Sequence, residues 1–297
     1  MQNFKHMSQS DKIFTVIVFI ILTFFFIAVL YPCVFVVSAS FSSGTAVQPG
    51  RVVLWPVDIS FEGYKTVFNT PTIWTGYRNS ITYTVVGTLI NLFMTLIAAY
   101  ALSRHDLPGR NGIMLLFTFT MFFNGGLIPM YMQVQNLHLL NSPLSLMLPT
   151  AISVYNMIVA RTFIVNSIPR ELLEASQIDG CSDLRYFISI VLPLSKAIIA
   201  VLTLFYAVGH WNAYFNAMIY LHDKAKYPLT LFLREILMST NIDPSTVSDP
   251  ELQARLADLA AVIKYALIMV SVVPVLVLYP FVQKYFVTGV MIGSVKG

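Results

Sequence analysis

Five long stretches of this chain contain no Asp, Glu, Lys or Arg, and they restrict the possible fold more than any other feature. They are residues 13–40, 79–103, 111–160, 197–221 and 265–283. A helix needs about 20 apolar residues to cross the hydrocarbon core of a bilayer. The stretches therefore have room for one, one, two, one and one membrane-crossing helices.

The composition agrees with this interpretation. Of the 297 residues, 57% are hydrophobic and 11% are charged, whereas soluble domains contain about 25% charged residues. The mean hydropathy is +0.72. We therefore predict an all-α integral membrane protein that forms a single membrane domain over residues 1–297.

The third stretch divides at residues 133–143, "QVQNLHLLNSP", where polar residues and Pro143 indicate a turn. The first stretch is longer than the 7–15 apolar residues of a signal peptide, so we expect it to be retained. The sequence then predicts six transmembrane helices, at about residues 13–38, 79–102, 112–132, 144–164, 197–220 and 261–283.

The positions of Lys and Arg predict the orientation of these helices. Six crossings place both termini on one side of the membrane, together with the loops 103–110 and 166–193. That side carries ten of the 18 basic residues, so we expect it to be the cytoplasm. The long loops 39–78 and 221–260 then lie outside the cell. The net charge of +4 requires no nucleic-acid partner.

If a membrane protein of this kind moves a solute, the chain itself shows no means of driving that movement. It lacks the phosphate-binding pattern G-x-x-x-x-G-K-[ST]. Its predicted helices contain no carboxylate of the kind that binds coupling ions in secondary carriers. No Cys/His cluster has the spacing of a metal site, and His210 is more typical of a hydrogen-bonded structural residue. We therefore expect no metal and no cofactor in this chain, and an energy source in a partner.

Residues 171–193, "ELLEASQIDGCSDLRYFISIVLP", form a regular polar segment between two apolar ones. Pro169 fits the first turn of a helix, and Gly180 supplies the left-handed residue that ends it. Ser182 is suited to cap a second helix, which ends before Pro193. The pattern predicts a helix-turn-helix in the cytoplasm.

One face of the first of these helices is suited to bind another protein. Glu171, Glu174, Ala175 and Ile178 share that face at i, i+3, i+4 and i+7 spacing. Small Ala175 and Ser176 permit the close approach of another surface, and Glu174 offers a carboxylate to a basic partner. The alternative is a hairpin that connects two membrane helices and lies on the lipid headgroups.

The spacing in this segment resembles the EAA loop of ABC-importer permeases. Its fixed positions are a Glu-Ala-Ser triplet, a Gly after three residues and Ile-x-Leu-Pro after nine more, with Ser176 in place of the second Ala. In that family the loop, here residues 166–193, is the coupling helix, and it docks in a groove of the ATP-binding subunit. The resemblance implies a coupling role for Glu171, Glu174, Ala175, Ser176, Gly180, Ile190, Leu192 and Pro193.

Other segments narrow the resemblance to carbohydrate permeases. Residues 78–104 look like the second span of MalG-like permeases. The segments "FNGGLIPMYMQVQNLHLLNSP", "GHWNAYFNAMIYL" and "YFVTGVMIGSVKG" are similar to the LplC and YtcP branch, whose members import oligosaccharides. The resemblance implies the type I ABC-importer permease fold in the bacterial cytoplasmic (inner) membrane, as part of a binding-protein-dependent transport system.

The resemblance also implies the partners of this chain. They are a second, MalF-like permease in a heterodimer, two subunits that bind ATP and Mg²⁺, and an extracytoplasmic sugar-binding protein. The chain would then be a non-catalytic permease subunit for oligosaccharides. An ion-coupled secondary carrier and a passive channel or scaffold are the alternatives.

The fifth predicted helix contains aromatic, hydroxyl and amide groups of the kind that bind sugars. The candidate residues of a sugar path are Tyr206, His210, Trp211, Asn212 and Asn216. The two Asn side chains have i, i+4 spacing and would be costly to expose to lipid. They either line the path or hold this helix against the partner permease.

The chain stays apolar beyond its last predicted helix. The tail "YFVTGVMIGSVKG" follows Lys284, and its apolar side chains need a surface to cover them. The resemblance implies that this surface is the pair of ATPase subunits, with Gly289, Gly293 and Lys296 as contact residues. The alternative is that the last helix continues for another turn and the remainder frays.

Overall fold

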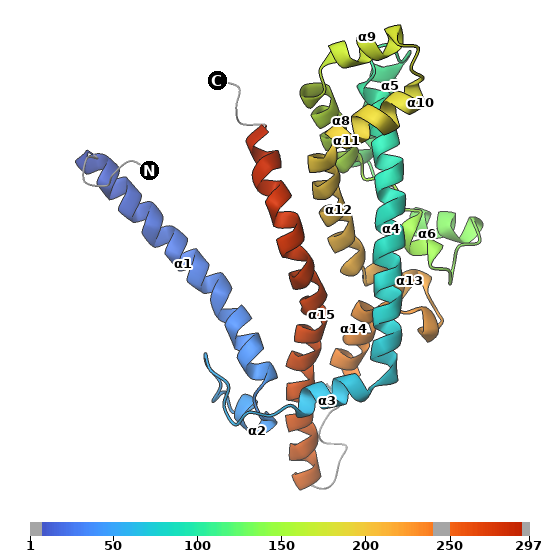
Figure 1. Ribbon diagram of the computed structural model, residues 1–297. Helices are drawn as coiled ribbons and strands as arrows, with labels where there is room; N and C mark the ends of the chain where they lie inside the picture. Colours follow the sequence, from blue (N-terminus) through green and yellow to red (C-terminus); the bar gives the residue numbers. More distant parts are fainter. Residues whose placement is uncertain (1–7, 240–249, 293–297) are drawn as a thin grey trace. The chain divides into compact units, whose positions relative to one another are not determined.

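The computed structural model describes residues 8–239 and 250–292. The regular structure of these residues is helical, apart from one isolated bridge between Ser42 and Ile59 (Figure 1). In chain order the helices are α1 (Gln9–Ser40), α2 (Gly44–Val47), α3 (Glu62–Asn69), α4 (Pro71–Ser103), α5 (Arg110–Phe122), α6 (Leu127–Asn136), α7 (Leu144–Met147), α8 (Val154–Ser167), α9 (Arg170–Ile178), α10 (Asp183–Tyr186), the π-helix η2 (Phe187–Val191), α11 (Leu192–Leu194), α12 (Lys196–Trp211), α13 (Phe215–Tyr220), the 3-10 helix η3 (Lys224–Lys226), α14 (Leu229–Ser239) and α15 (Pro250–Ile292). The predicted all-α class is confirmed.

Internal contacts divide the expected single domain into two compact units. The first unit consists of Met1–Thr70 and Glu235–Val272, and the second of Pro71–Arg234 and Val273–Gly297. The predicted cytoplasmic hairpin and the predicted sugar-path residues belong to the second unit.

Among the described residues, three helices are long and apolar enough to cross a membrane. There are up to five crossings if each sharply bent pair of helices is counted as one crossing. The three are Gln9–Ser40, Pro71–Ser103 and Ala257–Val277. They overlap the predicted helices 13–38, 79–102 and 261–283. The described residues therefore contain fewer continuous spans than the six that the sequence pattern predicts.

The other three predicted helices are interrupted. The helix predicted at 112–132 is the pair α5 and α6, bent by 117°. The bend follows from Gly126, which has a left-handed φ of 89°, and from the side chain of Asn124, which accepts the Gly126 N–H at 2.9 Å. Both residues favour a turn over a continuous helix.

The helices predicted at 144–164 and 197–220 are also divided. The first becomes α7 and α8, separated by a segment that contains Pro149, whose missing N–H disfavours a helix. The second becomes α12 and α13, where the side chain of Asn212 donates to the carbonyl of Val208 at 2.9 Å at the end of α12. Apolar composition predicts membrane depth, but it does not reveal these local breaks.

Helix α15 is longer than predicted in both directions. It begins at Pro250, inside the predicted loop 221–260, and it continues to Ile292, beyond the predicted end at 283. Gly289 is therefore helical. This agrees with the alternative stated above, in which the last helix continues beyond its predicted end. Gly293 and Lys296 lie outside the described residues.

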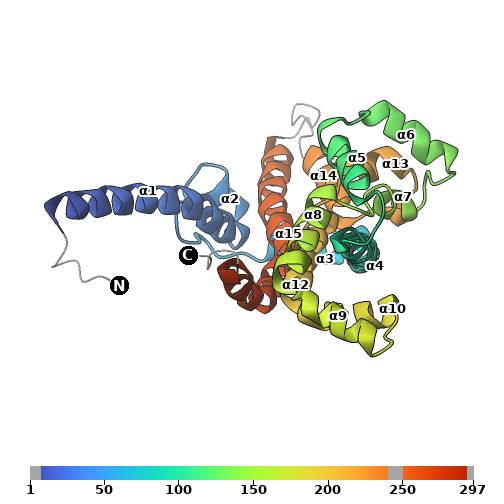
Figure 2. The same cartoon turned by 90° about the horizontal axis from the view of Figure 1, so that it is seen from above.

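The second unit is built around α4, with α8 and α12 packed against it (Figures 1 and 2). One face of α4 buries a row of polar side chains, whereas Leu89 on another face is 61% exposed. This is the reverse of a soluble helix, and it is typical of a helix whose apolar side faces lipid. The buried polar residues are Ser80, Thr84, Thr88, Asn91 and Thr95.

This polar row binds backbone groups that the break between α7 and α8 leaves free. The Nδ2 of Asn91 donates to the carbonyl of Thr150 at 2.5 Å. The N–H of Ser153 donates to the hydroxyl of Tyr206 at 3.3 Å, and this hydroxyl lies 2.7 Å from that of Thr95. A bilayer supplies no water to such groups, so a broken helix needs partners of this kind.

His210 of α12 lies against Gly87 of α4. Its Nε2 is 2.5 Å from the Oδ1 of Asn91, which accepts the hydrogen bond. A Cβ atom added to Gly87 would lie 2.5 Å from the same Nε2. The glycine therefore permits the close approach of the two helices at the point where the histidine is held.

We predict that Gly87→Ala destabilises the protein by about 1–3 kcal/mol, because the added methyl group overpacks the contact with His210. Gly209→Ala in α12 is the matched control, since an added Cβ there has nothing within 4 Å. Ala is favoured over Gly in a helix by about 0.5–1 kcal/mol, so this control should be neutral or stabilising. Thermal unfolding in detergent measures both, and equal midpoints for the two variants would contradict the packing.

Candidate functional site

The predicted helix-turn-helix is present at the end of the second unit, as Figure 1 shows for α9 and α10. Pro169 lies directly before α9, Gly180 has a left-handed φ of +70°, and the Ser182 hydroxyl accepts the N–H of Arg185. The helix start, the turn and the cap thus stand where the sequence pattern predicts them. We call the segment from Arg170 to Leu194 the hairpin.

The second arm of the hairpin differs from a regular helix. Helix α10 passes into the π-helix η2 and then into α11, which contains Pro193. Pro193 has no N–H to donate to the carbonyl of Ser189, and its ring crowds that carbonyl. The wide π turn immediately before it accommodates both effects. Pro193 therefore lies inside the helical arm rather than after it.

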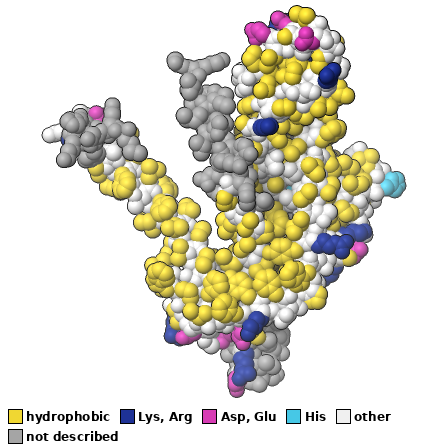
Figure 3. Space-filling view, viewed as in Figure 1, with side chains coloured by type: hydrophobic (Ala, Val, Ile, Leu, Met, Phe, Trp, Pro, Cys, Tyr) yellow, Lys and Arg dark blue, Asp and Glu magenta, His cyan; other side chains and the backbone are white. Residues whose placement is uncertain are grey.

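The outer face of α9 is open to a partner. Glu171, Glu174 and Ala175 are exposed, and Ile178 is 87% exposed. In Figure 3 acidic side chains gather over this helix at the top, whereas hydrophobic side chains cover the sides of the unit below. The expected docking face thus combines negative charge with an uncovered isoleucine.

Three other predicted coupling residues lie on the inner side of the hairpin. Ser176 is buried and donates to the carbonyl of Leu173 at 2.7 Å, so it is not part of the open face as we expected. Ile190 and Leu192 are half-buried against the core of the second unit. These side chains fix the hairpin to the membrane helices instead of presenting themselves to a partner.

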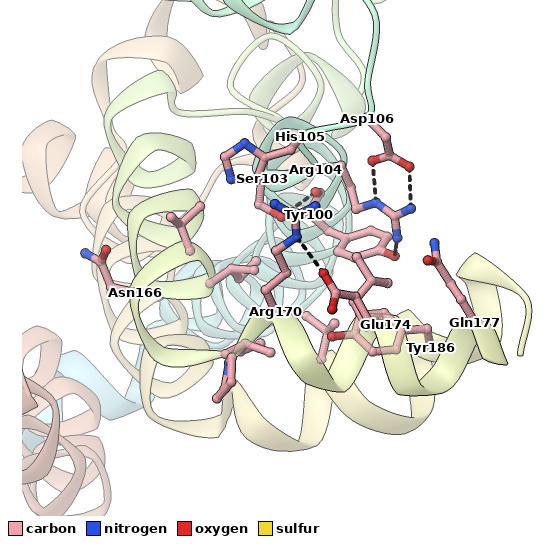
Figure 4. Close-up of a pocket in the computed structure, with 16 residues that line it drawn as sticks. Tyr100, Ser103, Arg104, His105, Asp106, Asn166, Arg170, Glu174, Gln177 and Tyr186 are labelled. Carbon is pink, nitrogen blue, oxygen red and sulfur yellow. Dashed lines mark hydrogen bonds and ion pairs between the residues drawn. The ribbon is translucent and has the colours of Figure 1, made fainter. Parts of the chain in front are cut away.

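The hairpin covers a pocket of about 320 Å³ at the cytoplasmic end predicted for α4. Figure 4 shows its lining side chains, which come from the ends of α4 and α8, the segment 104–106, α9 and the second arm of the hairpin. Several of its lining side chains are polar or charged. They include Tyr100, Arg104, Arg170, Glu174 and Tyr186.

Arg104 is the centre of a hydrogen-bonded group in this pocket. Its Nε donates to Asp106 Oδ1 at 2.8 Å and its Nη2 to Asp106 Oδ2 at 2.6 Å. Its Nη1 donates to Asp183 of α10 at 2.8 Å and to the Tyr100 hydroxyl at 3.2 Å. The hydrogen bonds from Arg104 lower the pKa of the Asp106 carboxyl to about 2, so Asp106 is ionised at neutral pH.

Further contacts join the end of α4 to its neighbours. The ring of Tyr100 lies 5.0 Å from that of Phe187 and 6.3 Å from that of Tyr186, measured between centroids. The Nε of Arg161 in α8 donates to the carbonyl of Leu102 at 2.8 Å, which satisfies one of the last carbonyl groups of α4. The hairpin and α4 thus form one packed junction.

Glu174 also has a partner within the chain. Its carboxylate lies 3.1 Å from the Nε of Arg170, and both side chains are largely exposed. An exposed i, i+4 ion pair contributes about 0.3–0.5 kcal/mol. A basic group of another protein can therefore replace Arg170 at little cost.

The structure places the predicted sugar-path residues in different surroundings. Tyr206 and His210 are turned toward α4 and bonded there, and buried Trp211 has its ring 6.2 Å from that of Tyr77. Asn212 is exposed at the end of α12, whereas Asn216 lies in α13. The expected i, i+4 amide pair is absent because the helix ends between these two residues.

Sequence reasoning missed the residues that organise this region. Asn91 and Thr95 belong to a row of polar residues at helical spacing in α4, and this spacing is visible in the sequence. Arg104 and Asp106 are two residues apart in the loop after α4. The pairing of Arg104 with Asp183 had no local signal, because 79 positions separate them.

No family model matches the chain, but similar proteins are known. The polygalacturonan/rhamnogalacturonan transport system permease protein YtcP of Bacillus subtilis is 40% identical over 289 residues, covering 97% of this chain and 100% of that protein. Protein LplC of the same organism is 38% identical over 297 residues, with 98% of each chain covered.

A solved structure is similar as well. It is a crystal structure of a bacterial ABC transporter involved in the import of the acidic polysaccharide alginate. The TM-score is 0.85 and the sequence identity 36%, over 94% of this chain and 99% of that chain.

We predict that Gly180→Val loosens the hairpin, whereas Gly180→Asn preserves it. A Cβ at this position meets nothing within 4 Å, so the effect comes from the backbone conformation alone. A left-handed conformation costs an ordinary L-residue about 1–2 kcal/mol, and Asn tolerates it better than a β-branched residue. Hydrogen exchange of the α9 and α10 amides should be faster in the Val variant. Equal exchange in the two variants would contradict this account.

Proposed function

The chain belongs to the permease subunits of sugar-importing ABC transporters, and from this premise we propose that it forms half of a translocation path for oligosaccharides. A second, MalF-like permease supplies the other half. Two ATP-binding subunits bind and hydrolyse ATP with Mg²⁺, and an extracytoplasmic binding protein delivers the sugar. This subunit does no chemistry. It lies in the bacterial cytoplasmic membrane with both termini in the cytoplasm.

The observation that carries this proposal is the open face of α9. Glu171, Glu174, Ala175 and Ile178 are exposed together on a helix whose other side is fixed to the membrane unit. A face of this kind suits the groove of an ATP-binding subunit, with Glu174 exchanging its internal partner for a basic residue there. Closure of the two ATPase subunits then moves the hairpin and rocks the membrane helices from inward to outward opening.

Two further contacts belong to the same proposal. Asn212 and Asn216 face the sugar or the second permease. The end of the chain, with Gly289, Gly293 and Lys296, contacts the ATPase pair. A secondary carrier or a passive channel does not need an exposed helix face that binds an ATPase. The open face of α9 therefore disfavours both alternatives.

The finer substrate class that we propose is oligosaccharides that carry carboxylates. Arg234 lies beside the break between α12 and α13, where its guanidinium carbon is 5.6 Å from the centre of the Tyr214 ring. Thr230, one turn earlier in α14, contacts the carbonyl of Ala213 within this break. A guanidinium binds carboxylates in a bidentate manner, and an aromatic face stacks on a sugar ring. The names of YtcP and of the alginate importer point to the same class.

We predict that the full chain, purified from native membranes, brings with it an ATPase and a second permease. Glu174→Lys should insert normally but release the ATPase and abolish sugar-stimulated ATP hydrolysis, because it places a like charge against the basic groove. Glu62→Lys, the same charge change in the predicted extracytoplasmic loop, is the control. Wild-type ATP hydrolysis by the Glu174 variant would show that the coupling assignment is wrong, and purification without an ATPase would refute the transporter type.

We also predict that Arg234→Gln lowers the uptake of galacturonate oligosaccharides by at least about tenfold, since the lost charge-assisted hydrogen bonds contribute about 1.5–3 kcal/mol. Uptake of neutral oligosaccharides of the same length should be unchanged. Lys224→Gln serves as the matched removal of one positive charge. Uptake is measured with the complete complex in proteoliposomes. An equal loss for both kinds of sugar would contradict the proposed substrate class.

A further inference from the structure

We propose that Arg104 is a positioning residue that links the hairpin to α4, so that a movement of the hairpin is passed to this membrane helix. The inference rests on the proposed function, because it concerns the route by which ATPase closure reaches the membrane helices. It assigns separate roles to the two carboxylates that Arg104 binds.

The location of Arg104 suits a link. It follows Ser103, the last residue of α4, so its backbone moves with that helix. Its Nη1 reaches Asp183, the first residue of α10, at 2.8 Å. A single side chain thus joins the end of a membrane helix to the second arm of the hairpin.

Burial makes this link stronger than an ordinary surface ion pair. The Arg104 side chain is 11% exposed, whereas those of Asp106 and Asp183 are 64% and 71% exposed. The packed neighbours fix the geometry of the guanidinium, so little additional side-chain entropy is lost when it binds. A nearly buried charge also needs its partners, and loss of one partner leaves it poorly compensated.

The two carboxylates have different geometric roles. Asp106 lies in the same loop and binds two edges of the guanidinium, through Nε and Nη2. This ion pair orients the guanidinium. Both of its residues lie in the loop after α4, so the pair makes no connection to the hairpin. Asp183 accepts from the remaining Nη1 and belongs to the hairpin. Asp106 therefore orients the guanidinium of Arg104, and Asp183 connects this guanidinium to the hairpin.

Beyond Arg104 the connection continues through rigid structure. Helix α4 runs without interruption from Pro71 to Ser103. Within it, Thr95 is bonded to Tyr206, and Asn91 to His210 and to Thr150. A displacement of the cytoplasmic end of α4 therefore acts directly on α12 and on the break between α7 and α8.

The test compares Asp183→Asn with Asp106→Asn in the complete complex, reconstituted in proteoliposomes with the binding protein and an oligosaccharide. Both variants remove one carboxylate from the same guanidinium. We expect Asp183→Asn to retain the ATPase and to hydrolyse ATP, but to transport at least about fivefold less sugar per ATP, at the lower end of usual coupling effects. Asp106→Asn should reduce transport per ATP less than Asp183→Asn does, because its Oδ1 can still accept from Nε and the contact between Arg104 and the hairpin remains. Asp183→Glu should restore most of the coupling.

Arg104→Gln extends the comparison. It should uncouple transport at least as much as Asp183→Asn, and the double variant Arg104→Gln/Asp183→Asn should be no worse than Arg104→Gln alone, because the interaction with Asp183 is already lost there. Equal transport per ATP in the two Asp→Asn variants would overturn the link. Loss of the ATPase from the Asp183→Asn complex would also overturn it, because Asp183 would then shape the docking surface itself.

These outcomes are distinct from failure of the proposed function. If the wild-type complex contains no ATPase, the transporter assignment falls and the link falls with it. If the wild type transports sugar with a normal ATP requirement and Asp183→Asn does the same, the link alone is refuted.

Discussion

The hydrogen-bonding requirement of a peptide backbone in lipid governs the second unit. Any helix that breaks inside the bilayer exposes N–H and C=O groups for which the surroundings offer no partner. In this protein α4 supplies partners from the side, because Asn91 and the Thr95–Tyr206 pair bind the segment between α7 and α8. The polar face of one unbroken helix therefore makes a broken neighbour possible. Its apolar face remains exposed.

The hairpin differs from the helices below it because its outer side carries exposed polar and charged side chains. Exposed pairs such as Arg170–Glu174 contribute little there, so they hold no structure in place. What holds the hairpin is apolar packing from Ile190 and Leu192, together with the nearly buried guanidinium of Arg104. The result is a rigid inner side and an open, exchangeable outer side. This division is what a surface needs if it must bind a partner and also move the membrane helices.

The sequence predicts those features that depend on local composition and spacing. Charge-free runs predicted the helical membrane class, and Pro169, Gly180 and Ser182 predicted the bounds of the hairpin, because each acts on the residues next to it. Breaks inside apolar runs escaped prediction, since hydropathy reports depth rather than helix continuity. Long-range pairs such as Arg104–Asp183 escaped it too, because the fold alone brings them together.

The contacts of α4 are unequal along its length, and this bears on how it moves. Near its middle and its C-terminal end, Asn91, Thr95 and Arg104 all have specific partners. Toward Pro71, Asn79, Ser80 and Tyr83 bind backbone groups of residues 225–229. Between these two bonded regions, the buried hydroxyls of Thr84 and Thr88 have no hydrogen-bond partner among the described residues. A buried polar group left unpaired costs about 1–3 kcal/mol, so this part of the polar face is held less firmly. A force applied at the C-terminal end of α4 therefore meets the bonds of Arg104, Thr95 and Asn91 first, and the turn at Thr84 and Thr88 is where the packing of this helix can yield.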